Sequence, residues 1–325
     1  MKIVKGHLGL ESFKKLNKNV DFFKKKIVVI GNFDGLHRGH QALLGRAKII
    51  SQREKIPWIV YSFWPHPVTV LGSIQKQHQL LTKNERYKQF IKFNTEILFE
   101  EKFTKEFSKI EPEDFFKKVI IDQLNASHLI VGYDFKFGAK RKGDIFLLKK
   151  MGEQFKVSIE IIEKQQIDNH VISSSEIRKL LKKGDVKLAC RLIGSPYFYS
   201  GKVIQGEQKG QKLGFPTLNL KISDEKVMIP YGVYATKVIF KSKSYHSISN
   251  FGTRPTFHVE KIPYLETHIL DEFDKNIYGE NISVHFFDYI REERQFSDVS
   301  ELIHQIQNDI FIVKAFHLDN KCPHS

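Results

Sequence analysis

Residues 28–40 read Val-Val-Ile-Gly-Asn-Phe-Asp-Gly-Leu-His-Arg-Gly-His, and this stretch decides how the first half of the chain folds. The apolar run at 27–30 is typical of a buried parallel strand, and a turn with regularly spaced glycines follows it. Such glycines let backbone amides approach a phosphate, and a helix start adds a positive dipole end. His37 and His40 stand where that helix is expected to begin. Two imidazoles placed there can neutralise charge on a nucleotide α-phosphate while pyrophosphate leaves.

The alternative is a tight turn with two surface histidines, and for an isolated Gly-x-Gly pair it would be the better interpretation. Here the turn follows a strand, opens a helix and carries paired histidines, so we favour nucleotide chemistry. The pattern Gly-x-Phe-Asp-Gly-x-His-x-Gly-His resembles the nucleotidylyltransferase superfamily. That resemblance implies transfer of adenylate or cytidylate to a phosphate-bearing substrate, without a covalent enzyme intermediate, and leaves the substrate open.

Length and composition predict a two-domain, intracellular protein. A chain of 325 residues with 41% hydrophobic residues can fill two cores. Cys190 and Cys322 lie far apart and form no metal or redox motif, which fits a reducing cytoplasm. The first residues contain no apolar leader, and no apolar run approaches a membrane span. We therefore expect a cytoplasmic protein without a membrane partner.

The chain is basic, with 52 Lys and Arg against 37 Asp and Glu. A basic surface can bind nucleic acid, and it can equally attract anionic small molecules such as ATP. The lysines are scattered in short pairs rather than gathered in one stripe with interleaved aromatic residues. We therefore expect no nucleic-acid partner.

Apolar runs alternate with amphipathic segments from about residue 25 to 185, which predicts a doubly wound parallel sheet, a Rossmann-like α/β domain. The ligand of such a sheet lies beyond the carboxyl ends of its strands, where the glycine turn is expected. The expected strands are 27–30, 58–63, 96–99, 128–131 and 158–161, and the expected helices are 39–53, 83–94, 112–124 and 143–153.

Short strand-like runs separated by Gly and Pro follow from about residue 195, which predicts an antiparallel β-barrel. A helix over about 298–316 is expected to close the chain. The domains are predicted as 1–185 and 186–325, joined through 183–196. The expected barrel strands are 199–205, 217–221, 232–240, 246–251, 264–270 and 282–289.

Three further motifs end strands or open a helix in the first half. Residues 63–67 (Phe-Trp-Pro-His-Pro) form a rigid loop, and residues 131–138 (Val-Gly-Tyr-Asp-Phe-Lys-Phe-Gly) carry two Phe rings that could form a slot for a flat ring or belong to the core. Residues 172–178 (Ile-Ser-Ser-Ser-Glu-Ile-Arg) match a capping box, and they also suit a triphosphate. Capping alone would not require Arg178.

In this order, the motifs resemble the adenylyltransferase half of the prokaryotic bifunctional riboflavin kinase/FAD synthetases. The resemblance implies that His37 and His40 are catalytic and contact ATP phosphates, and that Asp134 helps to hold the substrates. It further implies a flavin site that includes Phe63, His66 and Asp134. The implied ATP-binding residues are Gly31, Phe33, Asp34, Gly35, Gly39, Ser174, Ser175 and Arg178.

The second half carries the glycine spacing and the Leu-Gly-Phe-Pro-Thr-x-Asn sequence of the riboflavin kinase module at 201–219. On a strand, Thr217 and Asn219 would share one face and, with substrate phosphates and waters, suit Mg²⁺. A turn that ends in an ordinary strand is the weaker alternative. The glycines implied to bind ATP here are Gly201, Gly206, Gly210 and Gly214.

Further kinase signatures extend the resemblance over nearly the whole chain. It implies that Glu266 is the base for the ribityl 5′-hydroxyl and that Arg291 binds flavin. From the sequence alone, Glu266 could also be a surface carboxylate paired with His268. The sequence departs from the family in three ways. Gln211 replaces an arginine, the segment 271–278 is one residue longer than usual, and Asn276 stands at a position that is usually acidic.

These observations predict a bifunctional enzyme that converts riboflavin to FMN and then FMN to FAD, with ATP as co-substrate and Mg²⁺ as cofactor. Its partners would be riboflavin, FMN, FAD and ATP, and its oligomeric state stays open. One alternative is a riboflavin kinase with a weak or repurposed adenylyltransferase half. A basic nucleic-acid-binding regulatory protein is the other.

Overall fold

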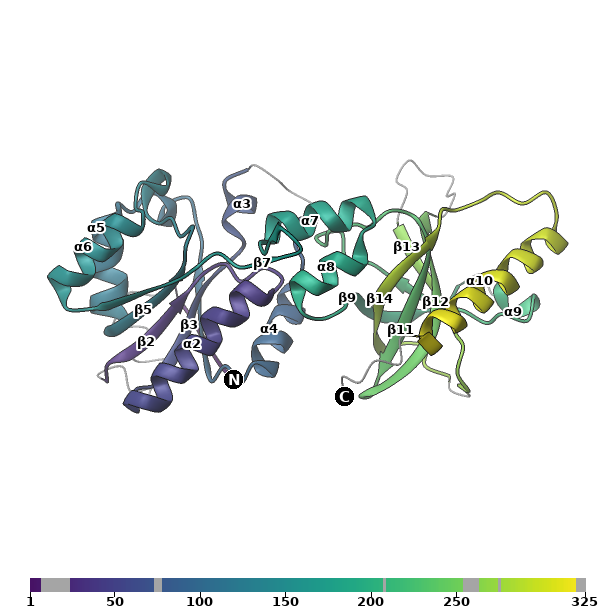
Figure 1. Ribbon diagram of the computed structural model, residues 1–325, viewed down its shortest axis with the longest axis horizontal. Helices are drawn as coiled ribbons and strands as arrows, with labels where there is room; N and C mark the ends of the chain where they lie inside the picture. Colours follow the sequence, from purple (N-terminus) through teal and green to yellow (C-terminus); the bar gives the residue numbers. More distant parts are fainter. Residues whose placement is uncertain (7–23, 73–77, 207–208, 254–262, 274–275, 320–325) are drawn as a thin grey trace. The chain divides into compact units, whose positions relative to one another are not determined.

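The computed structural model describes residues 1–6, 24–72, 78–206, 209–253, 263–273 and 276–319. The chain folds as two compact units, Met1–Ser174 and Ser175–Ser325 (Figure 1). Cys322 lies outside the described residues. No helix in the described ranges combines the length and the apolar character that crossing a bilayer requires.

The first unit is built on a six-stranded sheet with strand order β1-β4-β3-β2-β5-β6, in which every neighbouring pair is parallel. This confirms the predicted doubly wound sheet. Its strands are β1 (Lys2–Lys5), β2 (Lys26–Ile30), β3 (Trp58–Trp64), β4 (Ile97–Lys102), β5 (Ala126–Gly132) and β6 (Ser158–Ile162). The edge strand β1 was not predicted, because four residues beside the chain start carry too short an apolar pattern to stand out.

Helices connect these strands and cover the sheet. They are α2 (Arg38–Glu54), α3 (Pro67–Val70), α4 (Lys83–Lys92), η1 (Phe107–Lys109), α5 (Pro112–Phe115), η2 (Phe116–Gln123), η3 (Ala139–Arg141) and α6 (Ile145–Phe155). Helix α7 (Ser174–Lys183) begins at the last residue of this unit, and its other residues belong to the second unit. The helix predicted at 112–124 is a single α turn followed by a π-helical segment. A small antiparallel pair, β7 (Gln166–Ile167) and β8 (His170–Val171), precedes α7.

The buried centre of this unit is β2, which is buried along its whole length, as a strand covered on both faces is expected to be. Val28 and Ile30 belong to one large core cluster with side chains from α5, η2 and α6, and α2 also packs on β2. The connections leave β2 toward β3 and β4 and later turn back to β5 and β6. A topological switch point therefore lies between β2 and β5, where such sheets bind ligands.

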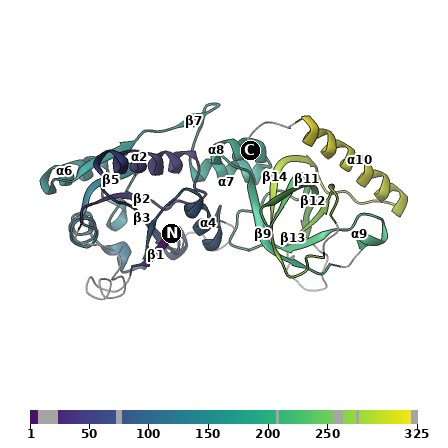
Figure 2. The same ribbon diagram turned by 90° about the horizontal axis from the view of Figure 1, so that it is seen from below.

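The second unit is a closed antiparallel barrel with strand order β10-β13-β12-β11-β14-β9. Its elements are α8 (Val186–Ile193), β9 (Tyr197–Ile204), α9 (Lys209–Lys212), β10 (Leu218–Lys221), β11 (Gly232–Phe240), β12 (Lys243–Thr253), β13 (Pro263–Ile269), β14 (Asn281–Arg291) and α10 (Val299–Asp319). Helix α10 lies beside the barrel (Figure 2) and packs against β11 and β12. Both the predicted barrel and its final helix are confirmed.

The segment expected to join the two domains contains helix α8. Asp185 caps its first turn by accepting a hydrogen bond from the Leu188 amide, and Gly194 ends it with a φ of 89°. Val186, Ala189 and Leu192 recur at helical spacing and are all buried. The segment named as the join thus includes a short amphipathic helix between two glycines. The boundary at residue 185 stays a prediction.

Candidate functional sites

The loop 31–37 follows β2 in a backbone conformation that is unusual for L-residues. Phe33 has a φ of 53° and Leu36 a φ of 38°, while Gly35 adopts 85° between them. Positive φ at non-glycine residues is uncommon and persists only where the surroundings hold it. The Asp34 carboxylate supplies one such restraint, because it accepts hydrogen bonds from the Leu80 and Leu81 amides at 2.9–3.3 Å.

His37 and His40 are stacked at the start of α2. Their ring centroids are 3.7 Å apart and their planes differ by 18°. His37 is the N-cap of α2 and accepts a hydrogen bond from the His40 amide at 3.4 Å. The Phe33 ring lies 5.2 Å from the His40 ring and packs the pair from within the unit. The two imidazoles therefore stand together at the N-terminus of a 17-residue helix, where the helix dipole favours an anion.

The strand ends beside this loop carry the other predicted motifs. Because β3 and β5 flank β2 in a parallel sheet, the loops after all three strands leave the same edge. His66 follows β3, is half-buried and accepts a hydrogen bond from the Val68 amide at 3.3 Å. Asp134 follows β5 and is exposed. The structure thus gathers three distant parts of the chain at one edge of the sheet.

The serine-rich helix start reaches the same loop. Ser174 Oγ donates a hydrogen bond to the Asp34 carbonyl oxygen at 2.9 Å. A Cβ atom at Gly39 would lie 3.6 Å from the Ile172 carbonyl oxygen, so the chain segments run close together here. Ser175 is exposed and Arg178, half-buried, follows one helical turn later in α7.

The aromatic side chains near this edge are mainly core residues. Phe137 is buried in the large cluster, and Phe135 stacks on it with centroids 5.6 Å apart. Phe63 makes edge contacts to Tyr61 and Phe103. Of the two alternatives for the Phe pair, the packing favours the core for Phe137.

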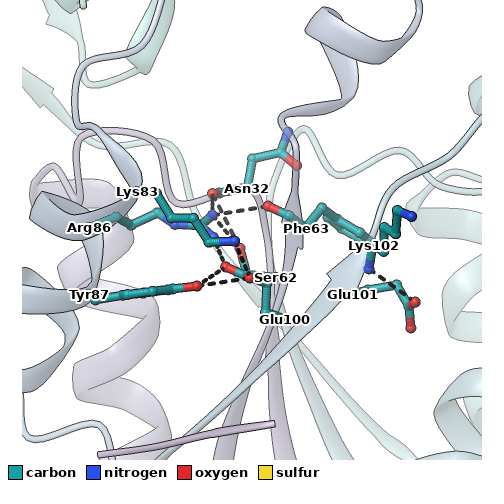
Figure 3. A network of polar contacts seen from close by, with 9 residues as sticks. All are labelled: Asn32, Ser62, Phe63, Lys83, Arg86, Tyr87, Glu100, Glu101 and Lys102. Atoms are coloured by element: carbon teal, nitrogen blue, oxygen red, sulfur yellow. Dashed lines mark hydrogen bonds and ion pairs between the residues drawn. The ribbon is translucent and has the colours of Figure 1, made fainter. Parts of the chain in front are cut away.

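The largest polar feature that the sequence analysis missed is a network at the ends of β3 and β4, centred on Arg86 and Glu100 (Figure 3). Both side chains are only 4% exposed and are joined at 2.8 Å. Glu100 also accepts hydrogen bonds from Tyr87 and pairs with Lys83. The sequence gives no signal that a polar residue of an amphipathic helix will be buried. This network could therefore not be predicted from the sequence.

In the barrel unit, the glycines of the second motif approach the predicted metal ligands. A Cβ atom at Gly206 would collide with the Asn219 amide group, so the chain can come this close only with a glycine there. A Cβ atom at Gly210 would collide with the Phe215 carbonyl oxygen and would lie in ordinary contact, at 3.5 Å, with Thr217 Oγ1. Gly201 lies within β9, and Gly214 has a φ of 87° in the turn before β10. Strand β10 begins at Leu218, so Thr217 lies just before the strand rather than within it.

Asn219, Glu266 and Asn250 form one row across three strands. Asn219 lies opposite Glu266 in the β10–β13 ladder, and Glu266 lies opposite Asn250 in the β13–β12 ladder. Directly opposed residues project to the same face, so these three polar side chains share one face of the sheet. Among the described residues, no group of three or more His, Cys, Asp and Glu could hold a metal ion. Asn219 offers a neutral amide oxygen on this face, and neutral oxygens suit Mg²⁺ when substrate phosphates complete its shell.

Two further side chains have clear structural roles near this face. One ring nitrogen of His268, Nδ1, lies 2.8 Å from the Pro216 carbonyl oxygen and anchors the turn before Thr217. Arg291 makes a bidentate ion pair with buried Asp309 of α10, at 2.7–3.0 Å. Its guanidinium thus holds the final helix, and the flavin contact that the resemblance implies stays a prediction.

Cys190 of α8 is a packing residue. Burial raises the pKa of its thiol to about 12, and its sulfur accepts a hydrogen bond from the Tyr197 amide at 3.1 Å. A thiol with so high a pKa is not a nucleophile near neutral pH.

The fold and the two sites define a protein of two units, each with a glycine-lined polar site suited to phosphates. Comparison with known families and proteins gives the same division. The FAD synthetase family model matches residues 20–176, and the riboflavin kinase family model matches residues 193–317.

Several curated bacterial proteins are similar to this chain over most of its length. A bifunctional riboflavin kinase/FMN adenylyltransferase of Bacillus subtilis is 36% identical over 88% of this chain and 90% of its own length. One from Buchnera aphidicola of Schizaphis graminum is 36% identical over 97% of this chain and 99% of its own length. The chain belongs to the family of bifunctional riboflavin kinase/FMN adenylyltransferases.

A solved structure supports the fold. A crystal structure described as a macrolide-efflux protein from Streptococcus pneumoniae superposes with a TM-score of 0.82 and 29% identity, and it covers 92% of this chain and 96% of that one. Both folded units therefore have a counterpart in an experimental structure.

Proposed function

We propose that this protein makes FAD from riboflavin in two ATP-dependent steps. The barrel unit phosphorylates riboflavin to FMN and releases ADP. The sheet unit then adenylylates FMN to FAD and releases pyrophosphate. The observation that carries the proposal is the presence of both family domains in one chain, at residues 20–176 and 193–317.

In the sheet unit, the FMN phosphate would attack the α-phosphorus of ATP, and the bond to the β-phosphate would break. The stacked pair His37 and His40 supports charge neutralisation at the α-phosphate, because both rings stand at the amino end of α2. Ser174, Ser175 and Arg178 would bind the remaining phosphates from the start of α7. The flavin would lie toward the strand ends that carry Phe63, His66 and Asp134.

The loop residues Gly31, Phe33, Asp34, Gly35 and Gly39 would line the nucleotide site through their backbone. The Asp34 carboxylate accepts backbone hydrogen bonds from Leu80 and Leu81, which supports a structural contribution to that site. A carboxylate held in this way would shape the loop without facing the triphosphate. Direct contact would be unfavourable, because both groups are negatively charged.

In the barrel unit, the ribityl 5′-hydroxyl would attack the γ-phosphorus of ATP while Glu266 takes its proton. Asn219 and Thr217 would hold Mg²⁺, which would neutralise charge on the transferred phosphoryl group. Gly201, Gly206, Gly210 and Gly214 would let the backbone approach the ATP phosphates. The shared face of Asn219 and Glu266 supports this arrangement, because it places the metal ligand beside the base.

The test is to incubate the purified protein with riboflavin, ATP and Mg²⁺ and to separate the flavins over time. FMN should appear first and FAD after it, with ADP and pyrophosphate as co-products. Supplied FMN should yield FAD directly. FMN without FAD would favour a riboflavin kinase with a weak adenylyltransferase half, and no flavin product at all would refute the proposal.

The same proposal assigns residues 1–185 to adenylyl transfer and 186–325 to the kinase. It places the enzyme in the cytoplasm, where the ATP that both steps consume is made available.

A further inference from the structure

Arg86 is a buried arginine that the reaction as described does not use. It lies on α4, and its Nη1 donates hydrogen bonds to the Asn32 carbonyl at 3.2 Å, to Ser62 Oγ at 3.1 Å and to the Phe63 carbonyl at 3.1 Å (Figure 3). Its Nη2 donates to Glu100 at 2.8 Å. Arg86 thus joins the ends of two strands to the loop that follows β2.

The surroundings of Arg86 fix the position of its guanidinium. Desolvation lowers the pKa of Arg86, and the neighbouring Glu100 carboxylate opposes that effect and favours the charged form. The guanidinium also lies over the Trp64 ring, 5.1 Å from its centroid. A planar fork with fixed donors can satisfy a carboxylate and several carbonyls at once, which a lysine cannot do.

The loop that Arg86 contacts needs such restraint. Phe33 and Leu36 hold positive φ angles of 53° and 38°. Each such conformation is unfavourable for a residue with a side chain and survives only where the environment imposes it.

Helix α4 and the residues just before it provide three attachments to this loop. The Leu80 and Leu81 amides hold the Asp34 carboxylate, and Phe90 packs edge-on against the Phe33 ring at 5.6 Å. The third attachment is the hydrogen bond from Arg86 to the Asn32 carbonyl.

The third attachment has a directional consequence. In a trans peptide the C=O and N–H groups point in opposite directions. With the Asn32 carbonyl held by Arg86, the Phe33 amide of the same peptide points away from Arg86. The Asn32 carbonyl also accepts a hydrogen bond from Ser62 Oγ at 3.3 Å, and Arg86 in turn donates to Ser62 Oγ at 3.1 Å. Loss of the Arg86 guanidinium would therefore remove one donor from this carbonyl and free the other, so the peptide could rotate and change the direction of a backbone donor in the nucleotide loop.

We propose that Arg86 is a positioning residue for adenylyl transfer, which sets the orientation of the Asn32–Phe33 peptide and so the shape of the loop that receives the ATP phosphates. The inference rests on the adenylyl-transfer function proposed above. It separates Arg86 from the residues that touch substrate, because its side chain acts only through the backbone of the loop.

The experiment compares two substitutions in the full-length protein. Arg86→Lys keeps a positive charge beside Glu100, but a single ammonium cannot span Glu100 and the Asn32 carbonyl. Lys83→Met is the matched control, because Lys83 pairs with the same Glu100 at 2.9 Å and no described contact joins it to the loop. For each protein, FAD formation from FMN is measured against ATP concentration, and FMN formation from riboflavin is measured in the same sample. Hydrogen exchange of the 31–36 amides and of the β2 and β3 amides is followed in parallel.

Arg86→Lys should lower kcat/KM for ATP in FAD formation by roughly 10-fold to 100-fold, the cost of a small misplacement at a reacting centre. FMN formation should stay within about twofold, since it is a property of the other unit. Exchange should rise in the loop and not in the two strands, and Lys83→Met should behave like the unaltered protein.

Three results would overturn the inference. They are FAD formation by Arg86→Lys within twofold of normal, an equal loss in Lys83→Met, and a rise in exchange that spreads equally over β2 and β3, which would mean general destabilisation. Failure of the unaltered protein to make FAD would count instead against the proposed function.

Discussion

Asn219 of β10 and Glu266 of β13 lie directly opposite each other in the antiparallel ladder of the barrel. Their side chains leave the sheet on the same face, within the short distance that separates a cross-strand pair. An amide oxygen that can bind a cation is thereby placed beside a carboxylate that can accept a proton. This register supports the proposed kinase reaction, in which a bound cation and a proton acceptor would act side by side.

Glu266→Gln is expected to cut FMN formation by roughly 10²-fold or more, because the amide keeps the shape of the side chain and cannot take the proton. FAD formation from supplied FMN should be unchanged. Steady-state assays of the two reactions in one preparation measure both quantities. Glu280→Gln serves as a control, since Glu280 is an exposed carboxylate paired with Lys241 in the same unit. A near-normal kinase rate in Glu266→Gln would mean that metal binding and positioning carry the catalysis.

The double variant His37→Asn/His40→Gln is expected to reduce FAD formation by roughly 10²-fold or more, the usual effect of removing a group that stabilises transition-state charge. Asparagine is chosen at 37 because His37 is the N-cap of α2 and asparagine caps well. FMN formation in the same sample should persist. His128→Gln is a matched histidine change in the same unit, where His128 pairs with Glu54. Equal loss of both activities in a folded double variant would show that the reactions are assigned to the wrong units.

Arg178→Ala is expected to raise the KM for ATP in FAD formation by roughly tenfold, the equivalent of one charged hydrogen bond. The melting temperature should hardly move. Lys179→Ala is the control, because Lys179 is exposed on the next position of α7 and pairs only loosely with Glu176, at 3.7 Å. Normal kinetics together with a large fall in melting temperature would instead assign Arg178 to helix stability.

The barrel unit is expected to lose stability as the pH falls below neutrality, because His317 of α10 is buried against it. Burial, with smaller contributions from His246 and Lys237, lowers the pKa of His317 from its usual 6.5 to about 4. His246 itself pairs with Asp271 and lies 4.6 Å from the His317 ring. The unfolded chain therefore binds a proton between pH 6.5 and 4 that the folded chain does not, so stability falls through this range.

The loss attributable to His317 should reach about 3 kcal/mol near pH 4. Denaturant unfolding of the unaltered protein and of His317→Gln, measured from pH 7.5 to 4.5, gives the difference between the two pH profiles. His304→Gln, at an exposed position of the same helix, should follow the unaltered protein. Parallel profiles for all three proteins would refute a buried, neutral His317.

The local features of this protein follow from its sequence. Apolar runs separated by amphipathic segments specify a parallel sheet with helices, because burial on both faces requires strands such as β2 to be apolar throughout. The glycine turn after β2 and the paired histidines predicted phosphate chemistry from the sequence as well. Glycines let backbone amides approach a phosphate, and histidines at a helix start can neutralise its charge. Alternation along β13 likewise placed Glu266 and His268 on one face.

Only the tertiary structure decided which of these residues meet, and which polar side chains are buried. The opposition of Asn219 and Glu266 depends on strand register, and the contact of Ser174 with Asp34 joins segments 140 positions apart. In the sequence, Arg86 looks like any other charged residue of an amphipathic helix, and only the folded structure shows that it is buried. Burial of a charge is a property of the packed molecule, because it depends on whether partners such as Glu100 and the Asn32 carbonyl arrive from elsewhere in the chain.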